Sequence, residues 1–183
     1  MGTRRRDAAR SRTAILAAAR ELFSTGRDVP MYEIGRSAGV GQATLYRHFA
    51  NRSAIAEAVV SEYVERLEQT AALHAGDERA VLVVLETGAD ALVEIHDLVG
   101  ILREDGAKAP LLAELRGRVL AALASAAESS CGLLRDSLAA DDLLLALNMV
   151  NGALVGVATA DERRACAARA LEIALRGLLR DPT

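Results

Sequence analysis

Two glycines near residue 40 are followed by a short run of polar and aromatic side chains. Residues 38–49 read AGVGQATLYRHF and bring an amide, a hydroxyl, a phenol, a guanidinium and an imidazole close together. All of these groups can donate hydrogen bonds to the base edges or phosphate oxygens of nucleic acid. Tyr46 and Phe49 are also two of only five aromatic residues in the chain. The run therefore predicts a local binding role; taken singly, each side chain also suits a structural or solvated position.

Residues 42–49 have the length and character of a recognition helix. Its first turn carries no bulky side chain and therefore fits a DNA major groove, which is about 12 Å wide. Arg52 begins the following helix, where backbone N–H groups attract phosphate, whereas Phe49 is expected in the core. The residues predicted to bind DNA are Gln42, Ala43, Thr44, Tyr46, Arg47, His48 and Arg52.

The segment before this helix has the small residues that a helix-turn-helix motif requires. Gly35 leaves space where the second helix crosses the first, and Gly39, four residues later, accepts a positive φ without strain. Val40 supplies an apolar residue to close the turn. We therefore predict that Gly35, Gly39 and Val40 form the turn, although corners of this shape also occur in proteins that do not bind DNA.

The whole chain reads as helices. It has 183 residues, 51% of them apolar and only three of them proline, and no stretch shows the alternation of a strand. We expect an all-α fold of about nine helices, with the joint between head and body at 74–79. The expected ranges are 13–24, 31–38, 42–49, 51–73, 78–96, 98–104, 111–128, 141–159 and 161–180.

Charge divides the chain into a basic head and an acidic body. Residues 1–52 carry ten arginines and four acids, a net charge of +6, whereas the remaining residues carry −9 and the whole chain −3. This asymmetry is expected when one end meets a polyanion. The first twelve residues form either a basic arm along the DNA or a solvated tail. Their arginines are Arg4, Arg5, Arg6, Arg10 and Arg12.

These motifs resemble a known family. The stretch VPMYEIGRSAGVGQATLYRHFANRSAIAEAVV, at 29–60, closely resembles the N-terminal signature of TetR-family transcriptional regulators. It contains an I-x-x-x-A-G-V turn, a T-L-Y-x-H-F recognition helix and an N-R-S entry to a fourth helix, with Gly35 where alanine is common. The resemblance implies an N-terminal three-helix DNA-binding domain and a C-terminal helical domain for ligand binding and dimerisation. It also implies DNA contacts at Thr44, Tyr46, His48 and Arg52.

The last two expected helices carry apolar seams that suit a second chain. Pairs of such helices from two chains would form a four-helix dimer interface, with an ordinary monomeric core as the alternative. The residues predicted at this interface are Leu143, Leu147, Val150, Leu154, Val157, Leu171, Leu175 and Leu178. Residues 143–160 carry no charge, but Asn148, Asn151 and the flanking acids argue against a membrane span.

The body offers pocket candidates but no catalytic motif. Four acidic residues, Glu86, Asp90, Glu94 and Asp97, either attract a cationic ligand or form a solvated face. The chain contains no Glu-x-x-His pair, G-x-S-x-G motif or Walker loop, so we expect no enzyme, metal or other cofactor. The apolar residues that form either a pocket or the core are Leu82, Leu85, Leu92, Leu98, Ile101, Leu102, Leu112, Leu115 and Val119.

Together these features predict a ligand-responsive transcriptional regulator. We expect a basic arm at 1–12, a helix-turn-helix domain at 13–56 that continues into the fourth helix, and a ligand-binding and dimerisation domain at 57–183. A homodimer would bind a palindromic operator, and an unknown small-molecule effector would release it; repression is implied by the resemblance. No apolar segment follows the N-terminus, so a cytoplasmic location is expected. A helical protein-interaction module is the alternative, but it leaves the basic head unexplained.

Overall fold

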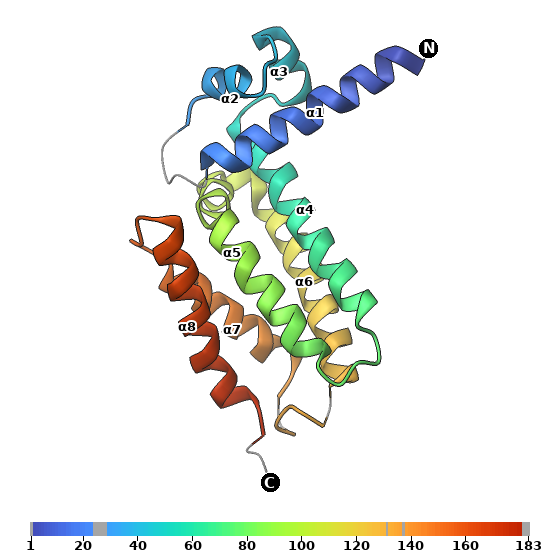
Figure 1. Ribbon diagram of the computed structural model, residues 1–183, viewed down its shortest axis with the longest axis vertical. Helices are drawn as coiled ribbons and strands as arrows, with labels where there is room; N and C mark the ends of the chain where they lie inside the picture. The colour runs from blue at the N-terminus through green and yellow to red at the C-terminus, as the bar shows by residue number, and fades with distance from the viewer. Residues whose placement is uncertain (1, 24–28, 131, 137, 181–183) are drawn as a thin grey trace.

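The computed structural model describes residues 2–23, 29–130, 132–136 and 138–180, and this part of the chain is almost entirely helical (Figure 1). It contains eight α-helices, a short 3₁₀ turn (η1) and no strand, with one isolated bridge between Leu134 and Leu179. The predicted all-α class is confirmed. The elements are α1 Gly2–Phe23, α2 Met31–Ser37, α3 Gln42–His48, α4 Arg52–Leu73, α5 Ala80–Glu104, η1 Gly106–Lys108, α6 Ala109–Ser129, α7 Ala140–Ala153 and α8 Ala160–Leu178.

The helices form a small head on an elongated body. Helices α1, α2 and α3 gather at one end of the molecule, and α4, α5 and α6 run side by side away from them (Figure 1). Helices α7 and α8 pack against each other and against α5. The recognition helix expected at 42–49 is α3, which lies at the tip of the head.

Side chains at the helix ends explain where the long helices begin. The Asn51 side chain accepts a hydrogen bond from the Ala54 N–H at 2.8 Å, which caps α4. Thr159 and Glu162 form a reciprocal capping box at the start of α8. Pro110 sits in the first turn of α6, where its missing N–H costs nothing.

Two apolar cores are connected by α4. The head core includes Ile15, Leu45 and Ile55, and it continues into Leu98 and Leu102 near the end of α5. The body core starts further along α4 and fills the space between α5, α6, α7 and α8. The predicted domain boundary after residue 56 therefore falls inside one continuous helix that belongs to both cores. Residues 74–79, expected as the joint, instead lie at the end of α4 away from the head (Figure 1).

Three helices differ from their expected ranges. Helix α1 begins at Gly2 and not near residue 13, so the described part of the predicted arm belongs to the first helix. Helix α5 continues through the break expected near residue 97, because Leu98 and Leu102 bury their side chains in the head core. Helix α7 ends at Ala153, and the following turn places Gly156 at φ +79°. No helix in the described residues is both long and apolar enough to cross a membrane.

The predicted dimer residues need correction, because most of them lie inside their own chain. The α7 seam faces the body core: Leu143, Val150 and Leu154 are completely buried there. The same 4-3 spacing serves the internal packing of α7, so a partner chain cannot reach these side chains. Of the remaining predicted residues, Leu147, Leu171 and Leu178 are buried, and Val157 and Leu175 are half-buried. The large apolar side chains that are exposed on α7, α8 and the turn between them are Leu145, Met149, Val155 and Ile173.

Candidate functional sites

The corner between α2 and α3 has a close helix crossing. Gly39 adopts φ +66°, and the Val40 N–H donates to the Gly35 carbonyl at 3.0 Å. A methyl group on Gly35 would lie 3.2 Å from Gln42 Nε2 and 3.3 Å from a methyl carbon of Leu45. The two helices therefore meet at Gly35 with little room to spare, and the left-handed turn at Gly39 directs α3 across α2.

Helix α3 presents one polar face to solvent. Leu45 is completely buried and anchors the helix to the head core. On the other side Ala43, Tyr46 and Arg47 are exposed, and the Tyr46 side chain retains 54% of its accessible area. The structure also leaves Gln42 exposed, while Thr44 and His48 are half-buried.

The polar side chains of this face bond to groups of the head. The Arg47 guanidinium donates to the Thr44 hydroxyl at 2.9 Å and to the Ala43 carbonyl at 3.2 Å. The Gln42 amide reaches back to the Tyr32 carbonyl at 3.4 Å. All of these bonds are exposed to solvent, so water or a ligand can replace them at low cost.

Two other arginines lie over aromatic rings of the head. Arg52, predicted to bind phosphate, is half-buried with its guanidinium 5.6 Å from the Phe23 ring centre. Arg12 of the predicted arm lies 4.9 Å from the ring centre of Phe49. Cation–π contacts of this kind hold the charges close to the head. The side chains of Arg4 and Arg5 lie outside the part of the molecule that the structure describes.

An exposed tyrosine on α2 was missed by sequence reasoning. Tyr32 retains 61% of its accessible area, and its carbonyl accepts the bond from Gln42. The head therefore exposes a second tyrosine, whose main chain is bonded to the first residue of α3. The signal was present in the sequence, since the head holds two of the three tyrosines of the chain.

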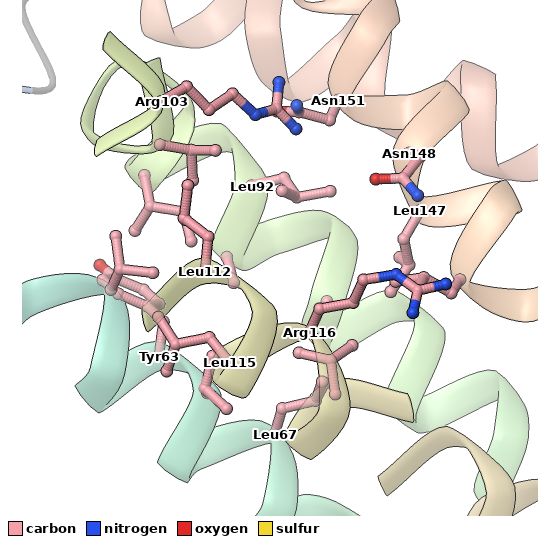
Figure 2. A pocket seen from close by; sticks show the side chains of 18 residues that line it. Tyr63, Leu67, Leu92, Arg103, Leu112, Leu115, Arg116, Leu147, Asn148 and Asn151 are labelled. Carbon is pink, nitrogen blue, oxygen red and sulfur yellow. The ribbon is translucent and has the colours of Figure 1, made fainter. Parts of the chain in front are cut away.

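The body contains a cavity of about 300 Å³ between α4, α5, α6 and α7 (Figure 2). Four of the candidate pocket residues line it: Leu92, Leu112, Leu115 and Val119. Others serve the cores instead, among them Leu85, Leu98 and Leu102, which are completely buried. The polar residues that line the cavity were not predicted from the sequence. They are Tyr63, Arg103, Arg116, Asn148 and Asn151.

Two hydrogen bonds fix polar groups at the cavity wall. The Tyr63 hydroxyl donates to the Glu94 carboxylate, and burial together with this bond raises the pKa of Tyr63 to about 12. His96 Nδ1 lies 2.9 Å from Asn151 Oδ1. With the amide oxygen of Asn151 facing the ring, Nδ1 of His96 is the donor in this contact.

The acidic series of α5 does not line this cavity. Asp97 forms an ion pair with Arg163 of α8 at 2.8 Å. Glu94 accepts a hydrogen bond from the Tyr63 hydroxyl but is not one of the residues that line this cavity. Glu86 and Asp90 are exposed. The charged residues that line this cavity are arginines, whereas Asp90 and Glu94 line a separate hollow between α4 and α5.

The head matches a known protein family. Residues 15–59, which span α2, α3 and the adjoining parts of α1 and α4, match the family model described as bacterial regulatory proteins, TetR family. An uncharacterized HTH-type transcriptional regulator of Mycobacterium tuberculosis is 36% identical over 131 residues, which are 64% of this chain and 61% of that protein. The match thus spans about three fifths of the length of the curated relative.

The whole fold matches solved structures of the same family. A TetR transcriptional regulator from Streptomyces coelicolor is 28% identical, with a TM-score of 0.70 over 93% of this chain and 99% of that chain. The head of this chain is therefore a TetR-family helix-turn-helix domain, and the whole chain resembles solved TetR regulators. A TetR-family protein from Mycobacterium vanbaalenii is 26% identical, with a TM-score of 0.68 over 96% of this chain and 99% of that chain. The SmeT–triclosan complex shares the TetR fold at 21% identity, with a TM-score of 0.57 over 93% of this chain and 92% of that chain.

Proposed function

We propose that this TetR-family protein binds a palindromic DNA operator as a homodimer, represses transcription there and leaves the DNA when a small molecule enters the body cavity. The observation that carries the proposal is the outward face of α3, where Ala43, Tyr46 and Arg47 are exposed on a helix anchored by the buried Leu45. A helix with this face fits a major groove about 12 Å wide.

The charge distribution supports DNA as the partner of the head. Residues 1–52 carry a net charge of +6 in a chain whose total is −3. Phosphate contacts from arginine provide most of the non-specific affinity of DNA-binding proteins. Base contacts from Gln42 and Arg47, and phosphate contacts from Thr44, Tyr46, His48 and Arg52, would then provide register and selectivity.

Exposed apolar side chains on α7 and α8 support a homodimer. Leu145 and Met149 lie one turn apart on α7, and Ile173 lies on α8; more than half of each side chain is exposed. Burying such side chains against a symmetric copy removes apolar surface from water on both chains. The two recognition helices of such a dimer would meet half-sites about one DNA turn apart.

The cavity and the head are mechanically connected at the start of α4. Ser53 donates to Asp105 at 2.8 Å, and the Lys108 ammonium donates to Glu57 at 2.6 Å. Asp105 and Lys108 join α5 to α6, two helices that also line the cavity. A ligand that separates α5 from α6 would therefore move the first turns of α4, which follow the recognition helix directly.

The fold of this chain also accommodates small molecules in a neighbour. SmeT, which shares the fold, forms a complex with triclosan. Release by a ligand means that the ligand-free protein occupies the DNA, so bound protein would block transcription and the ligand would restore it. This order of events is the basis for proposing a repressor.

Selection from a pool of random duplexes tests the proposed DNA binding. The purified full-length chain is expected to enrich a palindrome with half-sites about one helical turn apart. A Tyr46→Ala, Arg47→Ala double variant should enrich no motif, although it keeps the buried Leu45 that anchors α3. The proposal fails if the unaltered chain enriches no common motif.

A further inference from the structure

The cavity in the body has an apolar interior and a nitrogen-rich polar side. Aliphatic side chains and the Tyr63 ring form most of its wall. Figure 2 shows Tyr63, Leu67 and Leu115 on the side of α4 and α6, with Arg103, Asn148 and Asn151 on the side toward α7. No aspartate or glutamate contributes to the lining. The wall therefore favours a molecule with an apolar body and one polar end.

Asn151 turns a hydrogen-bond donor toward the cavity. Its side chain is only 8% exposed, and its Oδ1 already accepts the proton of His96 Nδ1 at 2.9 Å. Within the described residues the Nδ2 group of Asn151 donates to no protein acceptor, and Asn151 belongs to the cavity lining. An amide N–H₂ group that lines the cavity and has no protein acceptor is free to donate to a ligand or to water.

A positive charge lies at the same end of the cavity. Arg103 forms no ion pair with any residue that the structure describes, and its guanidinium and the Asn151 amide nitrogen are directed to the same end of the cavity (Figure 2). Arg116 also lines the cavity, but it pairs with Asp141 at 2.9 Å. Arginine and an amide N–H₂ together offer donors only, which suits a carboxylate or a similar anion.

We propose that the cavity binds an apolar molecule with a single anionic end group, held by Arg103 and Asn151 while its apolar body lies toward Tyr63 and Leu115. This inference rests on the proposed function, since it names the class of effector for the same pocket. A volume of about 300 Å³ is at the small end of ligand pockets and suits about a dozen non-hydrogen atoms. Decanoate is a probe of this size and chemistry.

Calorimetric titration of the full chain, without DNA, distinguishes the contribution of the ligand's end group to affinity from that of its apolar body. Decanoate, decan-1-ol and decylamine share one chain length and differ in charge. We expect decanoate to bind at least tenfold tighter than decan-1-ol, and decylamine to bind more weakly than both. Arg103→Gln should reduce decanoate affinity about tenfold and leave decan-1-ol within about twofold, because charge-assisted hydrogen bonds are roughly twice as strong as neutral ones.

Two further variants keep the result interpretable. Asn151→Leu should also remove the preference for decanoate, and unchanged decan-1-ol binding would show that the cavity is intact. Arg164→Gln removes an exposed arginine outside the cavity and should change neither affinity. Equal binding of decanoate and decan-1-ol, tighter binding of decylamine, or no binding of any probe would overturn the proposal.

The effector role is measured separately. Decanoate is added to the protein bound to the duplex selected from the random pool. Loss of the complex at concentrations that fill the cavity is expected. If decanoate fills the cavity through Arg103 while the complex persists, the proposed ligand class stands and the proposed release by ligand fails.

Discussion

The guanidinium Nη2 of Arg47 lies 2.9 Å from the hydroxyl oxygen of Thr44, three residues earlier on α3. Two of the side chains predicted to contact DNA are thus bonded to each other in the free protein. Since both are accessible from the helix surface, DNA can take over the Arg47 donors without exposing a buried group. Binding then costs at most two solvent-exposed hydrogen bonds, to Thr44 and to the Ala43 carbonyl, each of which is worth little.

Removal of the Arg47 side chain should weaken DNA binding. For Arg47→Ala we expect at least a tenfold loss of affinity for the selected duplex, because the change removes a charge-assisted contact. If Arg47 contacts phosphate, the slope of log affinity against log salt concentration should also fall by about one. The control is Arg79→Ala, which removes an equal charge at the far end of the body. Fluorescence anisotropy at several salt concentrations measures both quantities, and equal losses for the two variants would contradict a specific role for Arg47.

Whether a glycine-to-alanine substitution raises or lowers the free energy of unfolding should depend on the backbone conformation at that position. Gly39→Ala places a side chain at φ +66° and should lower the free energy of unfolding by about 1 kcal/mol. Gly117 lies inside α6 with nothing near its Cβ position, so Gly117→Ala should raise the free energy of unfolding by about 0.5–1 kcal/mol. Urea denaturation followed by circular dichroism measures both. Stabilisation by Gly39→Ala would show that the turn does not require its left-handed geometry.

Neighbouring arginines at the start of α8 should differ in their contribution to stability. Arg163 is 8% exposed, pairs with Asp97 at 2.8 Å and donates to the Val157 carbonyl at 3.0 Å. Arg163→Met leaves a carboxylate and a carbonyl without this partner and should cost about 2 kcal/mol, since Asp97 keeps 33% of its exposure. Arg164 forms an exposed pair with Asp161, so Arg164→Met should stay within about 0.5 kcal/mol. Similar losses from the two variants, measured by urea denaturation, would contradict this account.

One ion pair between α4 and α6 should contribute to acid sensitivity. Arg118 donates to both carboxylate oxygens of Glu68, at 2.8 and 2.7 Å, and these hydrogen bonds lower the pKa of Glu68 from its ordinary value of 4.5. A carboxyl group with a lowered folded-state pKa stabilises the fold above the unfolded-state value and loses this contribution as pH falls. Glu68→Gln should therefore be less stable than the unaltered chain near neutral pH, and the difference should shrink below pH 4.5. Urea denaturation between neutral pH and about pH 3 would reveal a constant difference if the interaction is not electrostatic.

The head could be predicted from the sequence because its signals are local. A left-handed glycine, an apolar anchor and an asparagine cap each act within a few residues, so Gly39, Leu45 and Asn51 carry the information themselves. The helical class was likewise readable from apolar spacing. The length of α5 was not, because Leu98 and Leu102 extend the helix by packing against the distant head.

The dimer residues and the polar cavity lining depended on contacts between distant helices. Helix α7 carries apolar side chains on both sides, and spacing alone could not tell that Leu143 and Val150 face the chain's own core while Leu145 faces outward. The orientation of the Asn151 amide depends on its contact with His96, which is 55 residues away in the sequence. The spacing of residue types along the sequence does not indicate which distant residues will be in contact.

A competition titration would measure whether the head binds DNA selectively. The purified chain is titrated at several salt concentrations against the DNA upstream of its own gene, with random DNA as the competitor. We predict tight, sequence-selective binding with one dimer per site and an affinity that falls as salt rises. Binding to this DNA no tighter than to random DNA, together with no motif from the random pool, would contradict the claim and favour a helical protein-interaction module.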